Sequence, residues 1–306
     1  MIVAVTGGSG YLAQRIIDYL LEKKIRVIVI SRKKLRFPKY KNIESLLIDW
    51  NKNYPIKIQA DVLIHTLRTN KLSKSFNKNN LTYQNKIINR ITQICLDNNI
   101  KKIFYISSIH IYKNFNKSTK ENNKSNFSFE NSYSKEKILF ENHLLNNKKL
   151  KDVNINILRL ANCFGYPGKY SGDCWNLFIN HICKKIFLDK KIIIKNNIHT
   201  HRNFIPISLV NDVIFKLLNS NKKKNIIINI ANDKSISLKK ITNIILTIIK
   251  NKYKIKPKLI HRNITPIKHR MNIDNTLIKK MRLNIDGKFK DELEQLIDYC
   301  YLNFNK

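Results

Sequence analysis

Long apolar runs, paired cysteines and glycine are all scarce or missing in this sequence. No stretch of about 18 apolar residues occurs, so no membrane-spanning helix is predicted. Met1 leads directly into an apolar segment, and we expect no signal or transit peptide. The five cysteines are odd in number and lack metal-type spacing, so we expect reduced thiols, no metal site and a cytoplasmic protein. At 306 residues the chain can form a full α/β core with a smaller dependent domain.

Acidic residues are also few, and the formal net charge is +37. One interpretation is a nucleic-acid or acidic-membrane partner. The other is compositional drift towards codons rich in A and T, because 47 of the 58 basic residues are Lys, and Ala, Gly and Pro are scarce. The lysines are dispersed, without a basic block longer than residues 222–224, so we favour drift and expect no nucleic-acid partner. A positive field would still attract anionic substrates.

Three of the seven glycines lie within four positions, at Gly7, Gly8 and Gly10. This concentration in a glycine-poor chain indicates a backbone requirement, since glycine allows positive φ and close approach of a ligand. The loop follows the apolar run at 2–5 and precedes an amphipathic segment at 11–24. A strand, a glycine turn and a helix form the arrangement that receives a dinucleotide pyrophosphate. We therefore predict that the cofactor contacts this loop at Thr6, Gly7, Gly10, Tyr11 and Leu12.

The residues after the second predicted strand bear on cofactor choice. NAD-dependent folds usually place a carboxylate there to hold the ribose 2′-hydroxyl. This chain has Ser31 followed by Arg32, and a guanidinium without a carboxylate suits a 2′-phosphate. The pattern predicts NADP rather than NAD. Asp49, after the third predicted strand, is a predicted adenine contact.

Strands and helices alternate along most of the chain, which predicts a doubly wound parallel sheet. Strands are predicted at 2–5, 26–30, 43–48, 61–65, 101–107, 154–160 and 226–230, with extended segments at 191–195 and 202–206. Helices are predicted at 11–24, 81–98, 131–141, 173–185, 209–219, 238–250 and 288–303. The polar stretch 113–131 lacks periodicity, and a loop of this length predicts a functional flap.

Tyr133 and Lys137 lie four residues apart on one face of a predicted helix. Hydride transfer at a carbinol carbon needs an acid/base at the oxygen, and a tyrosine, with an ordinary pKa of about 10, needs a nearby cation for this role. Lys137 can supply that charge and also hold the cofactor ribose. Ser108, at the end of a predicted strand, can orient the same oxygen. These residue types predict a Tyr/Lys/Ser catalytic set, although a Tyr/Lys pair also arises by chance in Lys-rich helices.

Five motifs in order resemble the extended short-chain dehydrogenase/reductase family, that is, the NAD(P)-dependent epimerases, dehydratases and reductases of nucleotide sugars. They are Thr6–Leu12, Ile106–Tyr112, Tyr133–Lys137, Arg159–Asn162 with Phe164-Gly165, and Arg202–Pro206. The resemblance covers nearly the whole chain. It implies a Rossmann-type domain at 1–168 plus about 205–232, and a smaller substrate-binding lobe at 169–204 and 233–306. It also implies substrate-diphosphate contacts at Asn162 and Arg202, with Arg270 as a further candidate.

The departures from the family pattern are informative. In 4,6-dehydratases of the family an Asp-Glu pair follows the position of Ser108, where this chain has Ile109 and His110, so we do not expect a 4,6-dehydratase. His110 matches a position where some members place an acid/base for epimerisation, and it can also be a histidine that merely points into the cleft. After the fourth strand the family usually has small residues near the pyrophosphate, where this chain has Leu67 and Arg68.

Three functions stay open at this point. The resemblance favours an NADP-linked epimerase or keto-sugar reductase acting on a nucleotide sugar, and it implies a homodimer. A catalytically silent NADP-binding or nucleic-acid-binding protein on the same fold would explain the charge but has no need of a complete Ser108, Tyr133 and Lys137 set. A family member acting on a small carbonyl compound without a nucleotide is the third.

Overall fold

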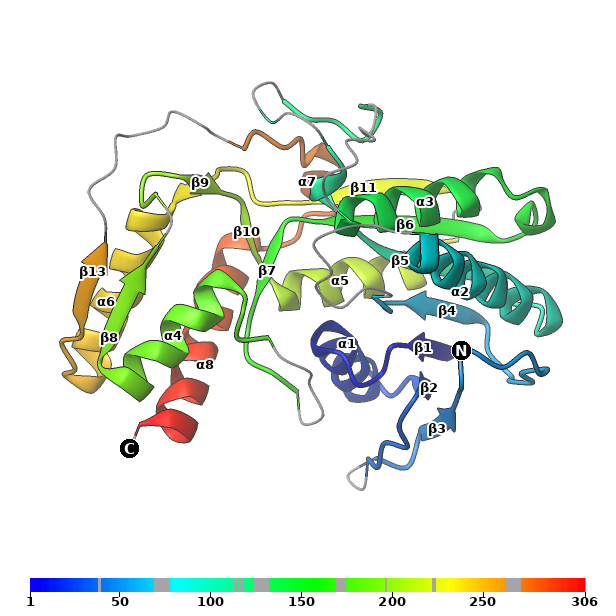
Figure 1. Ribbon diagram of the computed structural model, residues 1–306, viewed down its shortest axis with the longest axis horizontal. Helices are drawn as coiled ribbons and strands as arrows, with labels where there is room; N and C mark the ends of the chain where they lie inside the picture. Colours follow the sequence, from blue (N-terminus) through cyan, green and yellow to red (C-terminus); the bar gives the residue numbers. More distant parts are fainter. Residues whose placement is uncertain are drawn as a thin grey trace.

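A computed structural model of the chain shows the arrangement of its helices and strands (Figure 1). It describes residues 1–37, 40–68, 78–112, 115, 118–123, 132–168, 174–195, 197–221, 224–261 and 271–305, and for 78–80 the backbone only. Most of the predicted flap at 113–131 and the candidate substrate contact Arg270 lie outside these residues.

A seven-stranded sheet forms the centre of the larger part of the molecule. Its strands are β1 (Ile2–Thr6), β2 (Arg26–Ser31), β3 (Ile43–Leu47), β4 (Val62–His65), β5 (Lys102–Ser108), β6 (Asn154–Leu160) and β11 (Ile226–Ile230). Every pairing is parallel, in the order β11-β6-β5-β4-β1-β2-β3. The chain therefore reverses its direction of winding between β1 and β4, where ligands of open α/β sheets bind. The predicted fold class is confirmed.

Helices cover both faces of this sheet because its strands are apolar on both sides. On β5, Phe104 and Ile106 join one core cluster, with α1 (Tyr11–Glu22) and α5 (Ile207–Leu218). Ile103 joins the opposite cluster, with α2 (Lys78–Asp97) and α3 (Ser132–Asn146). The short helices η1 (Ile109–Ile111) and η2 (Lys148–Leu150) follow β5 and α3. The alternation along each strand thus produces three layers.

A third core cluster forms a separate lobe. It packs α4 (Phe178–Asp189), α6 (Leu238–Tyr253) and α8 (Ile285–Phe304) around β8 (Lys191–Ile194), which pairs with β13 (Lys258–His261). Two short pairings lie between the sheet and this lobe: β7 (Asn162–Phe164) with β10 (Phe204–Pro206), and β9 (His201–Arg202) with β12 (Ile236–Ser237). Helix α7 (Thr276–Lys280) packs against β11. The domain limits drawn from the sequence stay a prediction.

Two of the predicted elements need correction. The helix expected at 173–185 begins at Phe178, because Leu177 has an extended backbone and precedes the first helical turn. The extended segment expected at 202–206 is split: Arg202 pairs antiparallel with Ile236, whereas residues 204–206 pair parallel with β7. The second correction reflects pairing with segments that are distant in sequence.

A buried polar network joins α1 to the lobe. Arg15 on α1 forms an ion pair with Glu292 on α8, with nitrogen–oxygen distances of 3.0 and 3.2 Å, and the side chains are 8% and 1% exposed. The guanidinium also stacks on the ring of Tyr166, 3.5 Å from its centroid. Gly165 has φ of 152° and leaves no room for a Cβ atom beside the Glu292 carboxylate. The close approach of this strand end to α8 therefore requires glycine.

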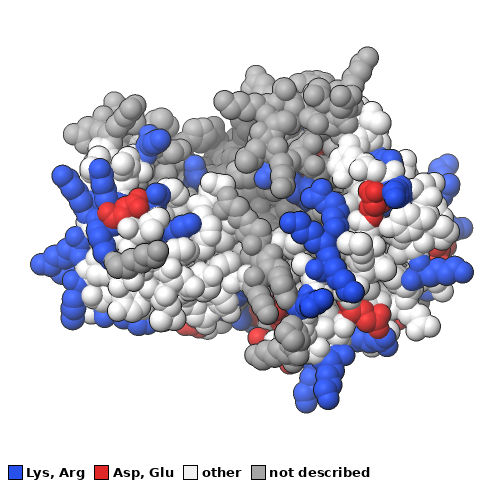
Figure 2. All heavy atoms as spheres, turned by 60° about the horizontal axis from the view of Figure 1, so that its bottom comes forward, with Lys and Arg blue, Asp and Glu red and all other residues white. Residues whose placement is uncertain are grey.

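Lys and Arg side chains are spread over the face shown in Figure 2 in several groups separated by uncharged surface. This distribution on the visible face agrees with the dispersion of lysine along the sequence. Among the described helices, none is long and apolar enough to cross a membrane.

Candidate active site

The glycine loop lies between the end of β1 and the start of α1. Gly7 has φ of 77°, and a Cβ atom there would approach Thr66 Oγ1 to 2.8 Å and the backbone of Leu67 to 3.2 Å. Gly10 is the N-cap of α1, without a capping side chain and without an acidic residue in the first turn. The amides of Tyr11 and Leu12 thus begin a helix whose own first turn carries no carboxylate. This cradle fits the pyrophosphate of a dinucleotide.

Some side chains predicted to contact the cofactor have internal partners. Thr6 Oγ1 is 2.7 Å from His65 Nδ1, and the Tyr11 hydroxyl donates to the Gly165 carbonyl at 2.9 Å. Their side chains therefore link the loop to β4 and to the segment that follows β7.

At the end of β2, the predicted 2′-phosphate contacts differ in exposure. Ser31 is buried, and its hydroxyl donates to the Lys33 carbonyl within a turn, whereas Arg32 is exposed. Asp49 is half-buried and accepts the amide of Asn51 at 2.9 Å. A guanidinium on a tight turn at this strand end is available to a phosphate.

Tyr133 and Lys137 lie on one face of α3 at the carboxyl edge of the sheet. Lys137 is 4% exposed, donates to the Ile106 carbonyl at 2.9 Å, and holds Nζ 5.7 Å from the centroid of the Tyr133 ring. Tyr133 is half-buried. Ser108 ends β5, and its hydroxyl accepts the His110 amide at 3.2 Å, which leaves its own proton for a ligand. The structure thus brings the predicted Tyr and Lys together.

His110, Asn162 and Arg202 line one cavity of about 400 Å³, together with Thr200, His201 and Met271. Desolvation lowers the pKa of His110, the nearby charge of Arg202 lowers it further, and a hydrogen bond with Asn162 opposes both. The ring centroids of His110 and Tyr133 are 6.4 Å apart. This cavity therefore lies near the predicted acid/base Tyr133, and the predicted substrate contacts Asn162 and Arg202 line it.

Arg68 was not predicted as a site residue. Its guanidinium carbon lies 4.9 Å from the centroid of the Tyr133 ring, on an exposed side chain just beyond β4. The signal was present in the sequence, since an arginine stands where the resemblance implies small residues. His65, also missed, is fully buried against Thr6, and burial followed by the charge of Lys137 lowers its pKa to about 3.

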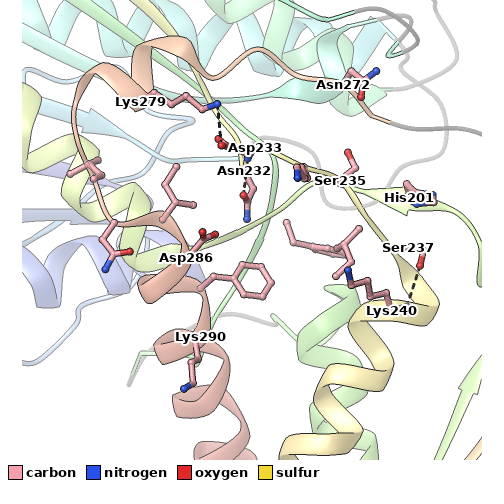
Figure 3. A pocket seen from close by; sticks show the side chains of 17 residues that line it. His201, Asn232, Asp233, Ser235, Ser237, Lys240, Asn272, Lys279, Asp286 and Lys290 are labelled. Atoms are coloured by element: carbon pink, nitrogen blue, oxygen red, sulfur yellow. Dashed lines mark hydrogen bonds and ion pairs between the residues drawn. The ribbon is translucent and has the colours of Figure 1, made fainter.

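A larger cavity of about 950 Å³ lies on the lobe, between the start of α6 and the segment joining α7 to α8 (Figure 3). Lys279 and Asp233 form an ion pair of 3.0 Å on one side of it, and Ser237 accepts the Lys240 amide at 3.2 Å on the other. His201 lines both cavities. Among the described lining residues of this larger cavity, Ser108, Tyr133 and Lys137 are absent.

The described side chains can perform proton transfer and hold anions. They include no group of three or more His, Cys, Asp or Glu placed to bind a metal ion. A parallel sheet with a glycine cradle at its switch point defines the class of doubly wound dinucleotide-binding proteins.

The comparison with protein families identifies the chain within this class. Residues 3–231 match the model of the NAD dependent epimerase/dehydratase family, and the chain belongs to that family. No curated protein sequence matches it significantly.

Solved structures of similar fold extend over almost the whole chain. A UDP-N-acetylglucosamine 4-epimerase from Methanobrevibacter ruminantium M1, in complex with UDP-N-acetylmuramic acid, is 22% identical over 97% of both chains, with a TM-score of 0.76. A UDP-glucuronic acid 4-epimerase from Bacillus cereus, in complex with UDP-glucuronic acid and NAD, is 16% identical over 99% of both chains, with a TM-score of 0.77. An NAD-dependent NDP-hexosamine 5,6-dehydratase of tunicamycin biosynthesis is 14% identical over 99% of both chains, with a TM-score of 0.74. At these identities the likeness shows the fold.

Proposed function

We propose that this protein is a nicotinamide-dinucleotide-dependent epimerase or keto-sugar reductase acting on a nucleotide-activated sugar. The observation that carries the proposal is the placement of Tyr133, Lys137 and Ser108 at the carboxyl edge of the sheet, across the switch point from the glycine loop. A binding protein has no need of a lysine buried beside a half-exposed tyrosine. The family to which the chain belongs supports the same chemistry.

The side chains divide the proton chemistry between them. The bound nicotinamide would supply hydride acceptance and return at the carbinol carbon. Tyr133 takes the hydroxyl proton of the sugar and returns it, and the buried Lys137 lies beside its ring. Ser108 donates its free proton to the same sugar oxygen and fixes its position. Epimerisation and reduction of a keto-sugar both use this set.

Elimination of water needs a further acid and base, and here the chain departs from the 4,6-dehydratases. Ile109 is fully buried in the core, so this position presents no acid to the cleft. His110 lines the cavity, and its lowered pKa leaves a neutral imidazole at neutral pH. A neutral imidazole accepts a proton, so we assign His110 to base chemistry and do not propose a 4,6-dehydratase.

The cofactor proposal is NADP or NAD, and two observations bear on the choice. The exposed Arg32 after β2 and the missing carboxylate support NADP. The Bacillus cereus epimerase is in complex with NAD, and this supports NAD in a protein of similar fold. Dissociation constants of both dinucleotides, measured by calorimetry at one salt concentration, decide between them.

The experiment for the main proposal uses the purified protein, dinucleotide and a panel of UDP-, dTDP- and GDP-sugars that includes 4-keto derivatives. Products are identified by mass and NMR while reduced nicotinamide is followed by absorbance. We expect conversion of at least one sugar, and a loss of about 10³-fold in kcat for Tyr133→Phe, which removes the proton but keeps the ring. Conversion without net cofactor change identifies an epimerase, and stoichiometric oxidation of the cofactor identifies a reductase.

The matched control is Lys256→Gln, at an exposed position of the lobe, which should keep wild-type kcat. Dinucleotide binding without conversion of any sugar on the panel contradicts the proposal. Tight, salt-sensitive RNA binding that survives Tyr133→Phe would then favour the silent binding protein.

A further inference from the structure

Arg68, just beyond β4, is exposed beside the predicted acid/base Tyr133. Thr66 and Leu67 flank the glycine loop, and Arg68 follows them with its guanidinium over the face of Tyr133. The side chain therefore extends from the loop towards the reacting end of the site. In this position it faces the group whose oxygen Tyr133 would contact.

The charge of Arg68 is not neutralised within the described part of the chain. No carboxylate there lies within ion-pair distance of its guanidinium, although nine such pairs occur elsewhere. The guanidinium instead contacts the ring of Tyr133. An exposed arginine beside an aromatic face retains all its N–H donors for a planar anion.

A second arginine, Arg202, lies near His110. Arg202 acts on His110 from within the 400 Å³ cavity, His110 faces Tyr133, and Tyr133 faces Arg68. Successive contacts thus connect Arg202 to His110, His110 to Tyr133, and Tyr133 to Arg68. A ligand that contacts all four side chains meets two guanidinium groups, which suits a molecule with two separate anionic groups.

We propose that Arg68 binds a carboxylate on the sugar, so that the substrate is a nucleotide-activated uronic acid or a related acidic sugar. The inference rests on the proposed function: Arg202 takes the diphosphate, Tyr133 takes the reacting hydroxyl, and Arg68 takes the carboxylate beyond it. Arg68 is a specificity-determining residue in this arrangement. The pyrophosphate of the dinucleotide offers the same oxygen chemistry, and the experiment separates the two sources.

The test measures dissociation constants by calorimetry for UDP-glucuronic acid and UDP-glucose, which differ by the carboxylate, at saturating dinucleotide and fixed salt. We expect the wild type to prefer the acidic sugar by about tenfold or more. Arg68→Gln should abolish this preference by weakening the acidic sugar alone. Arg68→Lys, which keeps the charge but not the planar fork, should retain part of it. Lys256→Gln, which removes one distant positive charge, should leave the ratio unchanged.

Three outcomes would overturn the assignment. A wild type that binds both sugars equally has no carboxylate site. If Arg68→Gln keeps the preference for UDP-glucuronic acid, the carboxylate site lies elsewhere. An equal weakening of both sugars, together with a weaker dissociation constant for the dinucleotide alone, assigns Arg68 to the pyrophosphate. Failure of the proposed function has a different signature, since no nucleotide sugar of either kind would then bind or react with the wild type.

Discussion

The two parts of the molecule are held together in different ways. Single α-helices join several neighbouring strands of the sheet domain: α1 links β1 to β2, α2 links β4 to β5, and α3 links β5 to β6. The lobe gathers α4, α6 and α8, which are separated by long stretches of sequence, around one short strand pair. Its limits cannot be derived from local patterns. The difference teaches that the predicted cofactor contacts lie in segments encoded locally, whereas the predicted substrate contacts Asn162 and Arg202 lie in pairings of distant segments.

The largest expected effect comes from breaking the link between these two parts. Glu292→Gln leaves the Arg15 charge buried without its partner, which should lower the free energy of unfolding by about 3–5 kcal/mol. Denaturant unfolding followed by tryptophan fluorescence and by circular dichroism measures the loss.

The exposed pair Lys185–Asp189 on α4 is the matched control, and Asp189→Asn should cost about 1 kcal/mol or less. If Glu292→Gln costs no more than this control, the ion pair does not hold α1 against the lobe.

A smaller effect is expected within the cofactor half. A Cβ atom on Gly8 would overlap Val29 Cγ1, so Gly8→Ala should destabilise by about 1–3 kcal/mol through overpacking. Adding Val29→Ala removes the overlapping atom, and the double-mutant cycle should show a favourable coupling energy. Gly10→Ala is the control, since its Cβ atom would meet only the Gly7 carbonyl, at 3.1 Å. Additive costs for Gly8 and Val29 would disprove the close contact.

Over a single pH unit, the smallest effect is a pH dependence from His65. Its pKa falls from an ordinary 6.5 to about 3 on folding, so the unfolded chain binds the proton more tightly between these values. Stability should therefore be complete above about pH 6.5 and decline as the pH falls towards about 3, by about 1.4 kcal/mol per pH unit for this proton. His65→Gln should reduce the slope measured between about pH 6 and about pH 5, whereas above about pH 7.5 the two curves should run parallel. Equal slopes in the acid range would contradict the buried neutral histidine.

The sequence predicted the sheet and the proximity of Tyr133 to Lys137 because these features leave local signals. Apolar runs indicated β1, β2, β6 and β11, and a spacing of four residues placed Tyr133 beside Lys137. The cavity beside His110 was only partly predicted. Thr200, His201 and Met271 reach it through the pairing of β9 with β12 and through the return of the chain beside it, which no local pattern encodes.

The sequence also marked Arg68 as a departure without placing it. The family pattern showed that an arginine is unusual at this position. Its contact with the ring of Tyr133 depends on the course of the chain beyond β4, which the pattern does not give. The roles of the predicted site residues stay proposals that the substitutions above examine.

The ion pair between Arg15 and Glu292 has a consequence for the order in which the protein acquires its structure during synthesis. The two residues are 277 positions apart, and α8 also supplies Leu293, Leu296 and Ile297 to the core of the lobe. When β11, the last strand of the parallel sheet, has left the ribosome, Glu292 on α8 has not yet emerged. The sheet domain can therefore begin to fold early, while the lobe and its junction with α1 wait for the last helix to emerge, and the nascent chain carries exposed apolar surface until then.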